Sequence, residues 1–300
     1  MYANQKTISD QISFEGIGLH SGDPVKITLI PQDINHGLVF NFNDQNIKAS
    51  WKNALISQLC TKIKNENFYL STIEHLMSAL SGLGITNLTI KTDSNEMPIL
   101  DGSSYEYVKK ILDVGIIDQN IKQRILKIKK KVSYKSDEKY IEIEPHDDES
   151  LVIDYTIDYK DDFIKKQTLS YEHNFEEYKK IYMARTFCLH EDLEKIFSMG
   201  LAKGGSLDNA IVVSGNKILN QGGLRYSNEF VKHKILDCIG DLYLAECQIH
   251  GKLTTYGGGH ELNLMILKEI FKDNQNYEFI NIEPSSENYV NNTNLKIATY

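Results

Sequence analysis

The first 60 residues alternate apolar and polar positions in short stretches. The stretch 25–30, Val-Lys-Ile-Thr-Leu-Ile, has the period-two alternation of a half-buried strand and is closed by Pro31. A largely apolar run over 71–81 predicts a helix, because Gly82 and Gly84 supply the residue type that commonly ends one. The rest of this unit is predicted, in chain order, as a strand at 87–91, a turn ending in 101–104 and a helix from 105 to about 112.

The second half of the chain repeats this order. Extended stretches at 139–144 and 151–157 precede a helix at 228–245, a strand at 252–256 and, after three glycines, a helix that runs to about 272. Repetition of one unit predicts an α+β fold of two similar domains, each a β-sheet packed on two helices. The active site is then expected at the domain interface.

We place the domain boundary so that the two domains cover 1–123 and 124–300. The basic run 122–131 is predicted to be a linker that leads into a solvated strand, because its charges alternate with Ile and Leu. An insert at about 184–213 interrupts the second unit and carries a helical stretch over 192–199.

The insert carries an apolar face. Leu193, Ile196 and Phe197 are spaced i, i+3, i+4 and share one side of a helix. This pattern is typical of a helix buried on its domain, and it also fits one wall of an apolar ligand pocket. The neighbouring Gly204-Gly205 pair lacks a surrounding Walker pattern, so a phosphate loop is not predicted.

Composition narrows the class of protein. The 300 residues are 41% hydrophobic and 25% charged, as in ordinary globular proteins, and the net charge of −8 argues against nucleic-acid or anionic-membrane partners. No apolar run approaches the ~20 residues of a membrane span, so stable membrane insertion is not expected. The first residues lack the apolar core of a signal peptide. The four cysteines show neither C-x-x-C spacing nor the density of a disulfide framework, which predicts a reduced, cytoplasmic protein, and we expect a monomer.

Two distant segments supply the parts of a catalytic metal site. His233 and Asp237 lie four positions apart, on one face of the second long helix, and can grip one ion. A third ligand from His75 would leave one tetrahedral position open, as in catalytic zinc sites. Glu74, beside that ligand, could then take a proton from a bound water. The alternatives are a packed histidine and a surface hydrogen bond, and Fe²⁺ also suits a His₂Asp set with open positions.

Seven motifs occur in a fixed order. They are 16–22 (GIGLHSG), 71–76 (STIEHL), 98–103 (PILDGS), 184–187 (ARTF), 203–209 (KGGSLDN), 233–241 (HKILDCIGD) and 259–260 (GH). From about residue 5 to 282 the chain closely resembles the UDP-3-O-acyl-N-acetylglucosamine deacetylase family, the zinc amidases that commit Gram-negative bacteria to lipid A synthesis. The resemblance implies a UDP-linked acylated amino sugar as substrate, with release of acetate.

The resemblance also implies roles for individual residues. His75, His233 and Asp237 match the zinc ligands, and Glu74 matches the general base. His260 matches a residue that stabilises the oxyanion or protonates the leaving amine, Asp241 matches its partner, and Thr186 matches a hydroxyl that binds the tetrahedral intermediate. The implied substrate contacts are Lys234 toward the nucleotide phosphates and Phe187 with insert residues Ile196, Gly205 and Ser206 along the acyl chain.

Several assignments stay open at this stage. Leu59 and Cys60 are placed at the mouth of the site, with Cys60 as a small apolar neighbour and not as a ligand. His20 lies in a motif but has no derived role, and 283–300 is expected to be a polar tail. Either Glu74 or His260 could protonate the leaving amine. Two alternatives to the implied function remain. One is another metal-dependent N-deacetylase or amidase, and the other is a non-enzymatic binding module that kept the fold.

Overall fold

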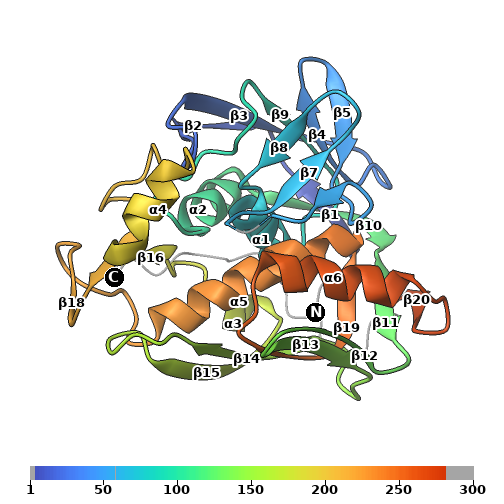
Figure 1. Cartoon of the computed structure of the whole chain (residues 1–300). Helices are drawn as coiled ribbons and strands as arrows, with labels where there is room; N and C mark the ends of the chain where they lie inside the picture. The colour runs from blue at the N-terminus through green and yellow to red at the C-terminus, as the bar shows by residue number, and fades with distance from the viewer. Residues whose placement is uncertain (1–3, 58, 282–300) are drawn as a thin grey trace.

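Two β-sheets enclose a central layer of helices (Figure 1). The structure is a computed structural model and describes residues 4–57 and 59–281. The sheet of the first half lies at the top of Figure 1 and that of the second half at the bottom, with the longer helices between them. This arrangement confirms the predicted α+β class. The boundary at 123/124 stays a prediction, and the polar tail expected at 283–300 lies outside the described residues.

The first half is built on a five-stranded sheet of order β2-β3-β9-β4-β5, in which β4 and β9 run parallel. Its apolar positions alternate inward, as at Val25, Ile27 and Leu29, which are all buried. Two smaller sheets flank it, one of β1 with β10 and one of β6, β7 and β8. The strands are β1 (Asn4–Ile8), β2 (Ile12–Ile17), β3 (Pro24–Pro31), β4 (Leu38–Phe42), β5 (Gln45–Lys48), β6 (Ala54–Leu55), β7 (Lys62–Lys64), β8 (Tyr69–Ser71), β9 (Leu88–Thr92) and β10 (Ile116–Lys122).

The second half is organised around its longest strand, β19. On one side β19 pairs with β13, and on the other side with β14 and then β11, changing partner near Gly251. Strands β12, β15 and β20 extend this sheet outward, and β16 and β17 of the insert form a small separate sheet with β18, which follows the insert. The strands are β11 (Arg124–Ile128), β12 (Val132–Ser136), β13 (Lys139–Glu144), β14 (Leu151–Asp158), β15 (Lys166–Glu172), β16 (Phe187–Leu189), β17 (Ile211–Ser214), β18 (Lys217–Ile218), β19 (Gln248–Tyr256) and β20 (Tyr277–Asn281).

The prediction of a linker at 122–131 is wrong. This run contains β11, which pairs with β19 on one side and β20 on the other. Ile125, Leu126 and Ile128 are buried, while Arg124 and Lys127 point to solvent. The alternation with Ile and Leu was therefore the signature of a strand inside a sheet, and the basic side chains only mark its solvated face.

The helical layer brings the two halves together through α1 (Glu74–Leu83) and α5 (Glu229–Leu242). They cross at Gly240, where an added Cβ would lie 2.1 Å from the backbone oxygen of Glu74. Glycine is thus required for this close approach of the two backbones. The other helices are α2 (Tyr105–Val114), α3 (Phe175–Tyr178), α4 (Leu193–Ser198) and α6 (His260–Phe271), with 3-10 turns η1 (His190–Asp192) and η2 (Tyr243–Ala245).

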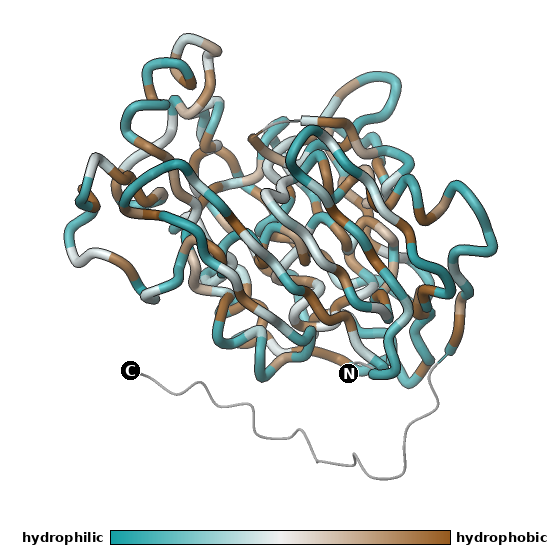
Figure 2. Tube along the Cα trace, turned by 60° about the horizontal axis from the view of Figure 1, so that its bottom comes forward, coloured by the Kyte–Doolittle hydropathy of each residue, from teal (hydrophilic) through white to brown (hydrophobic). Residues whose placement is uncertain are grey.

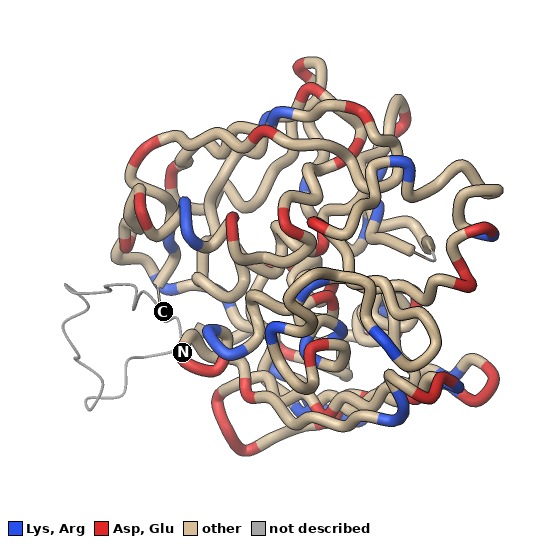
Figure 3. The backbone as a smooth tube through the Cα atoms, turned by 90° about the vertical axis from the view of Figure 1, so that its left-hand side faces the viewer, with Lys and Arg blue, Asp and Glu red and all other residues tan. Residues whose placement is uncertain are grey.

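Hydropathy and charge follow this architecture. Apolar and polar segments alternate along the strands in Figure 2, as period-two burial requires. Figure 3 shows acidic and basic residues interspersed along the loops and strands of one side of the molecule. Across residues 4–57 and 59–281, none of the helices has the length and apolarity needed to cross a membrane.

His173 makes the stability of the folded protein dependent on pH. It is buried, with Nε2 3.1 Å from the Ser81 hydroxyl of α1 and Nδ1 3.0 Å from the Tyr171 hydroxyl. Burial lowers the pKa of His173 to about 4. An unfolded chain takes up this proton near pH 6.5, so the free energy of unfolding falls as the pH drops from about 6.5 toward 4.

We expect His173→Gln to reduce this acid sensitivity. Between pH 7 and pH 5 the wild type should lose about 2 kcal/mol more stability than the variant, from the shift in pKa alone. Urea unfolding at the two pH values, followed by the fluorescence of Trp51, measures the difference. Parallel losses in both proteins would show that His173 is not the group that titrates.

Candidate active site

Three potential metal ligands converge where α1 and α5 cross. His75 lies in the first turn of α1, and His233 and Asp237 lie one turn apart on α5. Their ligand atoms all fall within 4.8 Å of one another, and the three side chains are buried. The imidazole Nε2 atoms of His75 and His233 lie 3.5 and 3.3 Å from Asp237 Oδ1. The i,i+4 spacing and the Gly240 crossing thus bring together the residues that the sequence had nominated.

The chemistry of these atoms fits a divalent cation. Asp237 Oδ1 is buried and has no hydrogen-bond partner among the described residues. Burial lowers the pKa of His233 to about 3, so its imidazole is neutral, and its Nδ1 lies 3.0 Å from the Ala184 carbonyl, to which it donates. Its Nε2 therefore presents a lone pair to the carboxylate. Two acceptors that face each other in a buried site need a cation between them.

Glu74 stands beside this triad and has one oxygen held in place. Its Oε2 accepts a hydrogen bond of 2.9 Å from the Thr61 backbone N–H, and its Oε1 lies 3.8 Å from His260 Nε2. Burial raises the pKa of the Glu74 carboxyl above its ordinary value. A carboxylate with a raised pKa and one unengaged oxygen is suited to accept a proton.

His260, the first residue of α6, forms a dyad with Asp241 of α5. Its Nδ1 lies 2.8 Å from Asp241 Oδ2, which also accepts a 2.8 Å hydrogen bond from Asn263 Nδ2. Burial acts to lower the pKa of His260, but the neighbouring Asp241 carboxylate outweighs it and raises the pKa to about 9. The imidazole is therefore charged at neutral pH and can serve as an acid through Nε2.

Lys234 forms an ion pair with Asp237, one of the candidate metal ligands. Its Nζ donates to Asp237 Oδ2 at 3.0 Å, which leaves Oδ1 to the two imidazoles, and it lies 5.7 Å above the ring of Phe187. Burial acts to lower the pKa of Lys234, but Asp237 raises it above its ordinary value. The contact to nucleotide phosphates that the resemblance implied stays a prediction.

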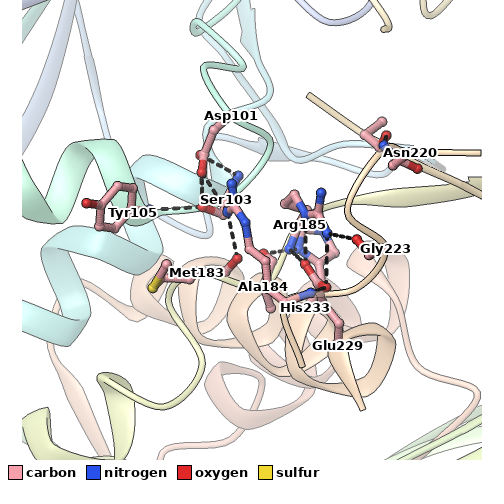
Figure 4. A network of polar contacts seen from close by, with 12 residues as sticks. Asp101, Ser103, Tyr105, Met183, Ala184, Arg185, Asn220, Gly223, Glu229 and His233 are labelled. Atoms are coloured by element: carbon pink, nitrogen blue, oxygen red, sulfur yellow. Dashed lines mark hydrogen bonds and ion pairs between the residues drawn. The ribbon is translucent and has the colours of Figure 1, made fainter. Parts of the chain in front are cut away.

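A buried ion pair fixes the segment that carries Thr186. Glu229 accepts from Arg185 Nε at 2.9 Å and from the Arg185 backbone N–H at 3.0 Å, and both side chains are buried (Figure 4). Arg185 lies between Ala184, which receives His233 Nδ1–H, and Thr186. The ion pair thus restrains His233, a candidate metal ligand, together with the candidate oxyanion hydroxyl of Thr186.

Residues of the first half also contact the segment that carries Thr186. Gly102 O accepts from the Thr186 backbone N–H at 2.8 Å, and Asp101 pairs with Arg225 at 2.7 Å. Gly102 has a φ of 81° and a Cβ there would lie 2.0 Å from the Asn209 backbone oxygen, so only glycine fits.

An apolar cavity of about 370 Å³ lies beside the site. Predicted contacts that line it are Leu59, Thr186, Phe187, Ile196, Gly205 and Ser206. Cys60 and Lys234 are not among its lining residues; Cys60 is buried next to Thr61, and burial raises the pKa of its thiol to about 12.

Helix α4 forms one wall of this cavity. Leu193, Ile196 and Phe197 all line it, yet none of them is fully buried and Phe197 is 53% exposed. The interpretation of α4 as a helix buried on its domain is therefore wrong. His20 also lines the cavity, and both of its ring nitrogens lack a hydrogen-bond partner among the described residues.

Three residues of the site had no signal in the sequence. Thr61 precedes a short strand, Glu229 opens α5 and Asn263 lies inside α6, each in a stretch without a recognisable spacing. Arg185 lies inside the motif 184–187, but the motif alone indicates no role for its side chain. Only the tertiary contacts of these residues reveal them.

Comparison with known proteins agrees with this geometry. Residues 5–272 match the family model described as UDP-3-O-acyl N-acetylglycosamine deacetylase. The chain is similar to the UDP-3-O-acyl-N-acetylglucosamine deacetylase of Campylobacter lari, with 41% identity over 94% of this chain and 97% of that protein. It is 41% identical to that of Campylobacter hominis, over 93% of this chain and 95% of the relative. The chain therefore belongs to the UDP-3-O-acyl-N-acetylglucosamine deacetylase family.

Proposed function

We propose that this protein hydrolyses the N-acetyl group of a UDP-3-O-acyl-N-acetylglucosamine and releases acetate, the committed step of lipid A synthesis. The proposed metal is zinc, held by His75, His233 and Asp237, and Fe²⁺ would also suit this set. The observation that carries the proposal is the buried triad with Glu74 and His260 beside it, next to an apolar cavity. A cytoplasmic location and a monomeric state also remain predictions.

The residues around the triad provide for amide hydrolysis. A cation held there supplies Lewis acidity, which acidifies an attacking water and polarises the amide carbonyl. Glu74 accepts the proton of the water through its unengaged Oε1. Thr186, fixed by Gly102 and by the Arg185–Glu229 pair, donates to the developing oxyanion.

The leaving amine needs a proton. His260 is charged at neutral pH and its Nε2 faces Glu74 across 3.8 Å. Either His260 donates its proton to the nitrogen directly, or Glu74 passes on the proton that it took from water. Both routes use groups that point into the same buried space.

Substrate choice tests the proposal against the rival amidases. Acetate release is followed with the UDP-3-O-acyl sugar and with simple N-acetyl sugars, before and after chelation and after readdition of Zn²⁺ or Fe²⁺. We expect turnover of the UDP-sugar only, lost on chelation and restored by metal. Equal turnover of simple N-acetyl sugars would favour another N-deacetylase, and no turnover of any amide would favour a binding module.

Acyl length should control catalytic efficiency if the apolar cavity holds the 3-O-acyl chain. Burial is worth about 0.8 kcal/mol per methylene, so removing three carbons should cost about 2.4 kcal/mol, or roughly 50-fold in kcat/KM. Steady-state kinetics over a series of acyl lengths measures the slope.

Two variants extend this series, one that should change the dependence on acyl length and one control that should not. Ala210→Leu narrows the cavity and should penalise the longest chains first, whereas Lys203→Ala, outside the cavity lining, should leave the slope unchanged. A rate indifferent to acyl length would show that the face of Leu193, Ile196 and Phe197 does not hold the substrate.

A further inference from the structure

Thr61 contacts both of the groups proposed to move protons. It lies just before β7, is 7% exposed, and belongs to the half of the chain that does not carry His260. Its backbone N–H donates to Glu74 Oε2 at 2.9 Å. Its hydroxyl donates to Asp241 Oδ1 and lies 3.1 Å from His260 Nδ1. One residue thus touches the candidate base and the candidate acid dyad.

These contacts define the direction of each hydrogen bond. The Asp241 carboxylate is only an acceptor, so the Thr61 hydroxyl proton points to its Oδ1. The hydroxyl oxygen is then free to accept from His260 Nδ1–H, which also reaches Asp241 Oδ2 at 2.8 Å. This arrangement places a proton on Nδ1 and turns Nε2 toward Glu74 Oε1, 3.8 Å away.

The same residue determines which oxygen of Glu74 is available. Since the Thr61 N–H occupies Oε2, the remaining Oε1 faces His260. Glu74 is 3% exposed, Asp241 2% and His260 9%, so little solvent can replace a lost donor. Loss of the hydroxyl would leave a buried carboxylate oxygen without one of its partners.

We propose that Thr61 is a positioning residue that holds Glu74 and His260 at a fixed separation, and that its hydroxyl thereby supports the turnover rate. Thr61 itself needs no contact with the substrate. The inference rests on the proposed roles of Glu74 and His260, and it adds a residue that acts through them.

The test compares Thr61→Val with Thr61→Ser. Valine keeps the shape and the backbone N–H but removes the hydroxyl, whereas serine keeps both polar groups. We expect Thr61→Val to lower kcat about 10- to 100-fold, as for loss of an outer-shell partner, with KM and metal content unchanged. Serine should restore kcat to within about threefold of the wild type, since its hydroxyl can make the same charge-assisted bond.

Two further variants make the result interpretable. Thr7→Val removes an equally buried hydroxyl, 6% exposed, that donates to Asn87 O in the first half, and should leave kcat unchanged. Glu74→Gln reports on the proposed site itself. Full activity in Glu74→Gln would overturn the proposed role of Glu74 as the base, whereas an inactive Glu74→Gln beside a fully active Thr61→Val would overturn only the role of Thr61.

Three other outcomes would also contradict the proposed role of the Thr61 hydroxyl. A Thr61→Ser variant as slow as Thr61→Val, a raised KM at unchanged kcat, or loss of metal from Thr61→Val would each refute positioning through the hydroxyl. Thr61→Ala carries the same test should the valine variant not fold.

Discussion

His233→Ala and Asp237→Ala should each lose the bound metal and, with it, all measurable turnover. Each change removes one of three buried candidate ligands, and in Asp237→Ala the ammonium of Lys234 also loses its carboxylate partner. The remaining two ligands leave the ion with more exchangeable positions, so it should dissociate during purification.

Metal analysis after gel filtration, beside acetate release from the UDP-3-O-acyl sugar, measures both effects. His36→Ala changes a histidine of the first half that is outside the triad and should keep full metal and activity. Full metal occupancy in both variants would show that the proposed metal site is wrong.

Glu74→Gln should keep its metal but lose at least about 100-fold in kcat, the low end for removal of a positioned general base. The amide oxygen can still accept from the Thr61 N–H, so the side chain should stay in place while its basicity is gone. The neighbouring candidate ligand His75 is unchanged, which is why the metal should remain.

Kinetics and metal content of the same preparation separate a base from a ligand. A fall in metal that parallels the fall in rate would assign Glu74 to the coordination sphere or to structure. Retained metal with lost turnover, beside an unchanged circular dichroism spectrum, supports its role as the base.

The sequence predicted those parts of the site whose spacing is set within one element. His233 and Asp237 share a helical face because α5 has 3.6 residues per turn, and His260 follows the glycines that precede α6. The helix–strand–helix order of both halves was likewise readable from periodicity. The approach of His75 to His233 and Asp237 depends on the tertiary structure. The family resemblance predicted it, whereas the spacing of these residues could only suggest it.

The remaining parts depend on contacts between distant segments. Thr61 and Glu229 act through partners far away in the sequence, and nothing local marks them. The run 122–131 was predicted to be a linker because its charged residues suggested a solvated segment. They lie on the solvated face of β11, whose other positions are buried in the sheet. The apolar face of α4 could not distinguish a domain core from a cavity wall, since both select the same residue types.

The proposed ligands come from both halves of the chain, so metal binding would affect how long the protein survives in a cell. An ion that binds only the folded chain adds stability that grows with its free concentration, because the unfolded chain holds no such site. In metal-poor cells a larger share of molecules would then be open to proteases at any moment, so the quantity of enzyme, and not only its specific activity, would follow metal supply. Pulse-chase measurement of its half-life with and without a permeable chelator would reveal this dependence.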